Sequence, residues 1–300
     1  MHDFIVGVDA GASHTVAALA RGERVLRTAV GDPANPNVGG LGPAVDAVAR
    51  TIERLLGNES AAAIGVGAAG AGDDAMRSAL AAALASRFPH ARLTVGDDAH
   101  IALRAAIPSG DGIVVIAGTG SIAYAEVGGS SRRAGGYGYL LGDEGSGYAI
   151  GAAALRRLLQ IAQVHAPQDP MLADLALQIG SNGLREAIAR IYASRTPAAE
   201  IAACAPLVLR YAAAGEPGAR EIVEKAAADL AELVSVILDS DQTASLPLAF
   251  AGGLLRESNA LSQLLEVRIA NDFPHLGIVK GGAPAYLGAL ADARRILQAP

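Results

Sequence analysis

The sequence has no tryptophan, one cysteine and four phenylalanines among its 300 residues. The single cysteine, Cys204, excludes a disulfide framework and a cysteine-ligated cluster built within one chain. Because large aromatic residues are scarce while alanine and glycine are abundant, the composition favours close packing of helices over an aromatic-rich sandwich. The same pattern predicts that Cys204, which lies among apolar residues at helical spacing, belongs to a core.

Long apolar runs and excess basic charge are also missing. The longest uncharged runs fall short of the ~20 residues that a membrane-spanning helix needs, and the N-terminal strand carries acidic residues, so we expect neither a membrane span nor a signal peptide. A net charge of −6 gives no electrostatic reason to expect nucleic acid or an anionic membrane as partner. We therefore expect a cytoplasmic protein.

Two familiar site patterns are absent as well. The six histidines show no H-E-x-x-H or paired spacing, which argues against a zinc site. No G-x-x-x-x-G-K-[ST] segment occurs, which excludes a P-loop. Any phosphate site must therefore be built differently.

A glycine-tipped hairpin is the main feature that is present. An apolar stretch, 113–117, enters the turn Gly118-Thr119-Gly120-Ser121, and alternating residues leave it. This is typical of a buried hairpin whose bare tip can bind phosphate through backbone N–H groups and two hydroxyls. A second copy, Phe4 to Ala20 with its turn at Gly11-Ala12-Ser13, opens the chain. We interpret the two copies as equivalent halves of a duplicated unit.

The order of elements supports two lobes. Strands are predicted at 4–9, 16–20 and 24–30, a rigid polar loop at 31–37, helices at 43–56, 74–86 and about 98–106, and further strands at 64–67 and 93–95. The second half repeats this with strands at 113–117, 122–127, about 131–134, 248–251 and 276–279, helices at 146–163 and 283–297, and a helical insertion at about 170–238. Alternation of this kind predicts mixed sheets flanked by helices, with ligands at the strand ends.

Carboxylates follow two of the predicted strands. Asp9 ends the first strand before a turn of small residues, where it can hold a hydrated Mg²⁺ beside phosphate or bond its own backbone. Ser13 and Thr15 are either phosphate donors or ordinary strand residues. Of Asp97 and Asp98, one is expected to cap the following helix, and the other can act as a general base for phosphoryl transfer to an alcohol.

The densest glycine cluster lies at 135–147, with six glycines, two tyrosines and two acids. So many glycines are costly in backbone entropy, which indicates close approach by a ligand. Within it, Asp143 is a candidate metal or sugar-hydroxyl ligand. Gly252-Gly253, after another apolar strand, suits a nucleoside lying on bare backbone, or a plain turn.

These motifs resemble the actin, hexokinase and sugar-kinase superfamily, and within it the N-acetylglucosamine kinase branch of the BadF/BadG/BcrA/BcrD-type ATPases. The resemblance covers nearly the whole chain in order and is most specific at 135–146, with Asp98-Ala99 and Gly281-Gly282-Ala283 as further matches. It implies a two-lobed α/β actin-like ATPase (ribonuclease H-like) fold with duplicated mixed sheets and a central cleft. It also implies lobes at 1–108, completed by a helix at about 285–300, and 109–284, with a helical insertion at about 165–240.

By the same resemblance the protein is an ATP-dependent amino-sugar kinase acting on the 6-hydroxyl of N-acetylglucosamine, with Mg²⁺ as cofactor and a homodimer as the expected assembly. Asp98 would be the base, and Asp9 and Asp143 the metal ligands. ATP would contact Gly11, Ala12, Ser13, Gly118, Thr119, Gly120, Ser121, Gly252 and Gly253. The sugar would contact Asn35, Asp98, Thr119, Gly136, Tyr137 and Asp143.

The sequence departs from the branch at Ala10 and Ala12, which replace glycines, and at Tyr137, which stands where the mammalian kinase has tryptophan. The sugar therefore stays open between N-acetylglucosamine, glucosamine and N-acetylmuramate. Two other classes compete. An activator ATPase of a radical dehydratase needs cluster-ligating cysteines beyond Cys204, and a sugar-binding regulatory protein would not need the retained acids Asp9, Asp98 and Asp143.

Overall fold

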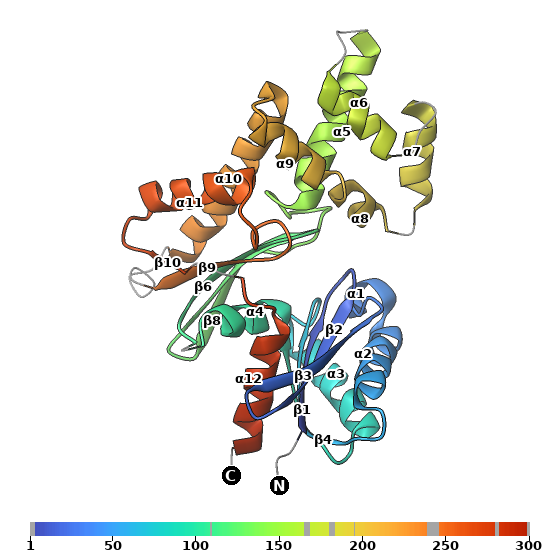
Figure 1. The fold of residues 1–300 in the computed structure, drawn as a ribbon, viewed down its shortest axis with the longest axis vertical. Coiled ribbons are helices and arrows are strands. Elements are labelled where there is room, and N and C mark those ends of the chain that lie inside the picture. The colour runs from blue at the N-terminus through green and yellow to red at the C-terminus, as the bar shows by residue number, and fades with distance from the viewer. Residues whose placement is uncertain are drawn as a thin grey trace. The chain divides into compact units, whose positions relative to one another are not determined.

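The computed structural model describes residues 4–108, 110–164, 169–179, 184–194, 196–238, 246–279 and 282–298. The chain divides into two compact units (Figure 1), and each is described by itself. Unit 1 comprises Met1–Gly110 and Ala283–Pro300, and unit 2 comprises Asp111–Gly282. Gly281, part of one family motif, lies outside the described residues.

Unit 1 is built on a five-stranded sheet in the order β3-β2-β1-β4-β5. The strands are β1 (Phe4–Ala10), β2 (Thr15–Arg21), β3 (Arg24–Gly31), β4 (Ala61–Ala68) and β5 (Arg92–Asp97). β1, β2 and β3 form an antiparallel meander, whereas β1, β4 and β5 run parallel. The carboxyl ends of these three parallel strands consequently share one edge of the sheet.

Helices cover both faces of this sheet because successive strand residues point to opposite sides. On one face α2 (Leu41–Leu56) and α3 (Asp74–Arg87) bury Val6, Val8 and Ile64. On the other face α12 (Tyr286–Gln298) packs on Ile5 and Ala18 through Leu290. The helix α4 (Asp98–Ala106) follows β5 directly and contacts α12.

Unit 2 repeats the arrangement. Its strands are β6 (Gly112–Ala117), β7 (Ser121–Val127), β8 (Ser130–Gly135), β9 (Pro247–Ala251) and β10 (Gly277–Val279). Their order, β10-β9-β6-β7-β8, is that of unit 1 read from the opposite edge, with the same pattern of parallel and antiparallel neighbours. The prediction of duplicated mixed sheets is confirmed.

Helices predominate between and after the strands of unit 2. They are α5 (Gly147–Val164), α6 (Pro170–Gln178), α7 (Leu184–Ala193), α8 (Pro197–Ala202), α9 (Ala205–Ala213), α10 (Pro217–Leu238) and α11 (Ala260–Asp272). The predicted helical insertion is therefore confirmed. Cys204 is 1% exposed within the core of this unit, which confirms its prediction as a core residue.

The predicted polar loop 31–37 is wrong at its end, where the one-turn helix α1 (Pro36–Gly39) begins. Asn35 caps α1 by accepting a hydrogen bond from the backbone N–H of Asn37, and Pro36 occupies the first helical position, where its missing N–H costs nothing. The last helix was predicted from residue 283 but begins at Tyr286.

Among the described residues, no single helix is both long and apolar enough to cross a bilayer. The pair Pro197–Ala213 and Pro217–Leu238, bent by 114° at its break, passes such a test only when taken together, and by length and composition alone.

Two helical glycines test the packing of α12. A Cβ at Gly288 would overlap the backbone carbonyl of Ile101 in α4, whereas a Cβ at Gly42, in the first turn of α2, would meet nothing within 4 Å. We therefore expect Gly288→Ala to lower the free energy of unfolding by about 1–3 kcal/mol because the two backbones must separate. Gly42→Ala should be neutral or slightly stabilising.

Thermal and urea unfolding of both variants, followed by circular dichroism, measure this difference. Equal stability of the two variants would contradict the close packing of α12 on α4.

Candidate active site

In unit 1 the acidic residues gather at the carboxyl edge of the sheet. Asp9, in β1, lies in register with Gly67 of β4, and Asp97, the last residue of β5, lies in register with Ala68. Asp98 follows at once as the first residue of α4. The parallel pairing of three strands thus brings together carboxylates that are about ninety residues apart in the sequence.

The two adjacent aspartates have different roles. Asp97 is the N-cap of α4, and its Oδ1 accepts a hydrogen bond of 2.6 Å from the backbone N–H of His100. This leaves Asp98, which is half-buried, as the acid without the capping role. Of the two alternatives predicted for this pair, the structure assigns the cap to Asp97.

The environment of Asp98 raises its pKa to about 6. Burial is the largest cause, and the negative charges of Asp97 and Asp9 add to it, while the N–H groups of Asp98 and Ala99 act in the opposite direction. A carboxyl group with a pKa close to neutrality suits proton transfer better than an ordinary aspartate, since it is ionised at neutral pH yet more basic.

The turn after β1 is held by backbone hydrogen bonds, from Gly11 N–H to the carbonyl of His14 and from Ala34 N–H to the carbonyl of Gly11. Ala12 and Ser13 are exposed at its tip. Thr15, in contrast, is fully buried, and its hydroxyl donates to the carbonyl of Asp32. Of the alternatives left open for Thr15, the structure favours the ordinary strand residue.

Asn35 is positioned by its cap and by the end of β4. Its Oδ1 accepts from Asn37 N–H and lies so close to Gly70, which follows β4, that a Cβ there would overlap it. Position 70 therefore requires glycine for two reasons: its φ of +83° disfavours other residues, and a side chain there would overlap Asn35. Asn35 thus belongs to the same edge of unit 1 as the acids.

In unit 2 three loops meet at the tip of the β6–β7 hairpin. The carbonyls of Gly118 and Thr119 accept hydrogen bonds from the N–H groups of Gly147 and Tyr148, at the start of α5. The carbonyl of Ala117 accepts from Leu254 N–H, directly after Gly252-Gly253. The predicted second phosphate loop and the predicted nucleoside loop are therefore neighbours. The contact of the hairpin tip with α5 was not predicted, because nothing local in the sequence indicates it.

The carboxylate of Asp143 contacts this tip at Gly120 and Ser121. It is 8% exposed and adopts φ of +62°, and its Oδ1 accepts a hydrogen bond of 3.3 Å from Ser121 N–H. A Cβ at Gly120 would lie 2.7 Å from its Oδ2, so this carboxylate requires a glycine opposite it. Burial raises the pKa of Asp143, while the N–H groups of Ser121 and Gly138 counteract that shift.

The other predicted site residues of unit 2 differ in exposure. The Ser121 hydroxyl is buried and donates to the carbonyl of Glu144. Gly136 donates its N–H to the carbonyl of Ser121, at φ of +71°, and Tyr137 next to it is 69% exposed. Gly252 is packed under Ala117, whereas Gly253 is exposed with open space around it.

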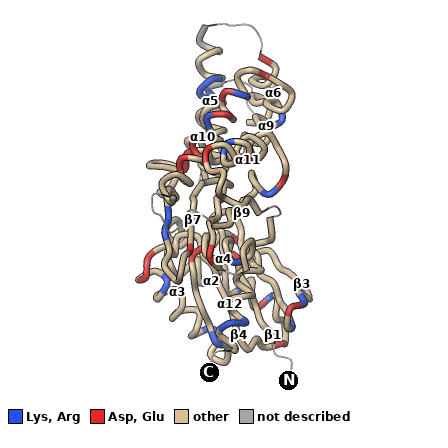
Figure 2. Tube along the Cα trace, turned by 90° about the vertical axis from the view of Figure 1, so that its left-hand side faces the viewer, with Lys and Arg blue, Asp and Glu red and all other residues tan. Residues whose placement is uncertain are grey.

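The predicted residues are thus grouped within each unit. Asp9, Asn35, Asp98 and the exposed tip at Ala12-Ser13 belong to unit 1, and Gly118 to Ser121, Gly136, Asp143 and Gly252-Gly253 belong to unit 2. In the view of Figure 2, basic and acidic residues are interspersed along the traces of both units.

Comparison with known proteins agrees with this arrangement. The chain is 29% identical over 97% of its length to an N-acetylmuramic acid/N-acetylglucosamine kinase of Clostridium acetobutylicum, of which 98% is covered. It is 30% identical over 59% of its length to an N-acetyl-D-glucosamine kinase of Dictyostelium discoideum, of which 57% is covered.

Among solved structures, a candidate N-acetylglucosamine kinase from Chromobacterium violaceum is similar with a TM-score of 0.77 and 28% identity over 99% of both chains. The two sheets of identical topology are those of the actin-like ATPase fold, and the predicted fold class is confirmed. The sequence profile of the BadF/BadG/BcrA/BcrD ATPase family matches residues 6–290. The chain therefore belongs to the BadF/BadG/BcrA/BcrD ATPase family.

Proposed function

We propose that this protein transfers the γ-phosphoryl group of ATP to the 6-hydroxyl of N-acetylglucosamine or a close amino-sugar analogue. The observation that carries the proposal is Asp98, a half-buried carboxyl group with a pKa raised to about 6, beside Asp9 and not occupied in capping its helix. Membership of an ATPase family and similarity to proteins named as amino-sugar kinases support the choice of donor and acceptor.

In this reaction Asp98 accepts the proton of the sugar hydroxyl as the oxygen attacks the γ-phosphorus. The new O–P bond forms while the bond to the β-phosphate oxygen breaks, and ADP leaves. Phosphoryl transfer needs little covalent help from the protein, so orientation and one basic group are what the chain must supply. Its pKa near 6 keeps Asp98 ionised, and hence able to accept the proton, at neutral pH.

Magnesium is the metal that this chemistry uses, and the residues fit it. Among the described residues no group of three or more His, Cys, Asp and Glu side chains could hold a metal by themselves. Mg²⁺ is commonly held by one or two carboxylates together with phosphates and water, so a single carboxylate such as Asp9 suffices. Bound there, Mg²⁺ would neutralise charge on the ATP phosphates. Asp143, the second predicted metal ligand, accepts backbone hydrogen bonds from Ser121 and Gly138.

The other predicted site residues are assigned to the part of the substrates that each is proposed to contact. Exposed Ala12 and Ser13, with Gly11, and the tip Gly118 to Ser121 are proposed to bind the phosphates, and Gly252-Gly253 the nucleoside. Asn35, Thr119, Gly136, Tyr137 and Asp143 are proposed to contact the sugar. Leu140 and Leu141, in the same loop as Tyr137, are exposed as well, and an exposed apolar segment of this kind supports a ligand-facing role. A cytoplasmic setting, where ATP is available, and a homodimer complete the proposal.

The first test incubates the protein with Mg·ATP and N-acetylglucosamine, glucosamine or N-acetylmuramate, and identifies sugar phosphate by mass spectrometry. Asp98→Asn should lower turnover by at least about 10²-fold while leaving ATP affinity near that of the unaltered protein, because the base acts in the transition state alone. Asp46→Asn, on the exposed face of α2, is the matched control. ATP binding with no phosphorylated product from any sugar would overturn the assignment in favour of a regulatory protein.

A second test addresses Asp9. Asp9→Asn should raise the Mg²⁺ concentration required for half-maximal turnover by roughly tenfold or more, since an amide oxygen is a weaker ligand than a carboxylate. Turnover is titrated with MgCl₂ at fixed ATP. An unchanged Mg²⁺ requirement would show that another group holds the metal.

A third test uses the pKa of Asp98 without any substrate. Because this pKa is raised from 3.8 to about 6 on folding, the folded state binds the proton more tightly, and stability falls as pH rises from about 4 through 6. Asp98→Asn removes this effect, so the variant should match the unaltered protein below pH 4 and exceed it above pH 6 by up to about 3 kcal/mol.

Urea unfolding at a series of pH values from 4 to 8 measures this stability difference, with Asp46→Asn again as control. A difference that does not change with pH would place the Asp98 pKa at its ordinary value.

A further inference from the structure

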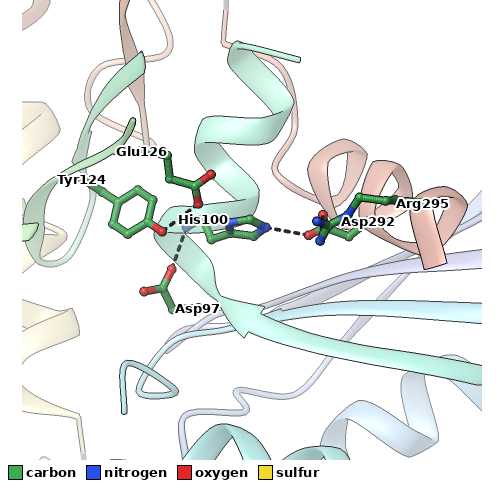
Figure 3. A network of polar contacts seen from close by, with 6 residues as sticks. All are labelled: Asp97, His100, Tyr124, Glu126, Asp292 and Arg295. Carbon is green, nitrogen blue, oxygen red and sulfur yellow. Dashed lines mark hydrogen bonds and ion pairs between the residues drawn. The ribbon is translucent and has the colours of Figure 1, made fainter. Parts of the chain in front are cut away.

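A histidine–aspartate pair joins the helix that carries Asp98 to the last helix of the chain. Figure 3 shows His100 of α4 pointing toward Asp292 of α12, with 2.8 Å between Nε2 and Oδ2. The two residues are 192 positions apart in the sequence and lie in the same unit. His100 is two positions after Asp98, in the first turn of α4.

The pair is largely shielded from water. The side chains of His100 and Asp292 are 18% and 9% exposed. The second carboxylate oxygen of Asp292 lies 3.3 Å from the guanidinium of Arg295, one turn later in α12. Truncation of His100 would leave a buried carboxylate short of a partner, which is costly, so this contact constrains where both helices can lie.

The contacts between α4 and the rest of unit 1 also include close steric packing. Ile101 fills the space above Gly67, and Gly288 lies against the backbone of Ile101. Contacts of this type set mainly the distance between elements. The hydrogen bond of 2.8 Å to Asp292 adds a directional constraint, because the energy of a hydrogen bond falls steeply with distance and angle. The bond from His100 N–H to the Asp97 side chain fixes the start of α4, and the side-chain bond to Asp292 ties the same residue to α12.

We propose that His100, held by Asp292, is a positioning residue that sets the rotation of α4 and thereby the location of the Asp98 carboxylate. The inference rests on the proposed kinase function, in which the Asp98 carboxylate must be aligned with the sugar hydroxyl. A displacement of about 1 Å in a reacting group can lower turnover about 10²-fold. Loss of a tether two residues from Asp98 should therefore lower kcat more than it weakens substrate binding.

Kinetics of three variants test the proposal. His100→Ala should lower kcat on the order of tenfold to a hundredfold with the KM for ATP changed by less than about threefold. His100→Gln, whose amide can donate from nearly the position of Nε2, should recover most of the lost kcat. Leu290→Val loosens the packing of the same α12 on the sheet but leaves the pair intact, so it serves as the control for a purely structural effect.

If His100→Ala and His100→Gln are equally impaired, or if Leu290→Val lowers kcat as much as His100→Ala at the same loss of thermal stability, the positioning role is wrong.

A readout that needs no activity separates this inference from the proposed function. Amide hydrogen exchange in the segment 98–103 should be faster in His100→Ala and in Asp292→Ala than in the unaltered protein, and near normal in His100→Gln. Absence of sugar phosphorylation by the unaltered protein would refute the kinase assignment alone. Unchanged exchange in His100→Ala would refute the tether whatever the activity.

Discussion

The architecture of unit 1 depends on how closely α12 approaches the sheet. A Cβ at Gly7 of β1 would lie 2.5 Å from the carbonyl of Tyr286, and one at Gly65 of β4 would overlap the carbonyl of Ala289. Only glycine allows a helix backbone to rest directly on two strands in this way. The same helix admits α4 at Gly288 and holds it at Asp292. The last helix of the chain therefore supports both elements that carry Asp9 and Asp98.

The two sheets have the same topology, but the residues and contacts at their strand ends differ. In unit 1 the strand ends carry the acids, and a backbone hydrogen bond from Ala69 N–H to the carbonyl of Ala10 joins the end of β1 to the loop after β4. In unit 2 the end of β6 is joined to the loop after β9 in the same way, and the β6–β7 tip is bonded in addition to the start of α5, with Asp143 buried next to it. These additional bonds leave the β6–β7 tip less conformational entropy to lose on binding a ligand, which supports the proposal that it binds phosphate. In the β1–β2 turn, Ala12 and Ser13 are exposed.

Local patterns predicted most of the strands and helices because each is short, strongly apolar and bounded by glycine, proline or aspartate. They also predicted that one residue of the Asp97-Asp98 pair caps the following helix and that the other does not. Which residue is the cap could be decided only from the structure, where His100 N–H donates to Asp97. What could not be predicted involves residues far apart in the sequence. The buried role of Thr15 depends on Asp32, and the link between His100 and Asp292 spans most of the chain. No local periodicity encodes such contacts, since tertiary packing alone creates them.

In the proposed mechanism, the raised pKa of Asp98 sets the stability of the folded protein against proton transfer by the same side chain. Burial and the nearby charges of Asp97 and Asp9 disfavour its ionised form, so the folded protein is less stable at neutral pH than it would be with a neutral residue there. Evolution of stability alone would remove such a group, whereas a proton acceptor gains from the same environment. The glycine-mediated packing of α12 on β1, β4 and α4 stabilises the same elements that bear the acids. Under the proposed mechanism, the backbone contacts of a single helix thus support the residues that carry out the chemistry.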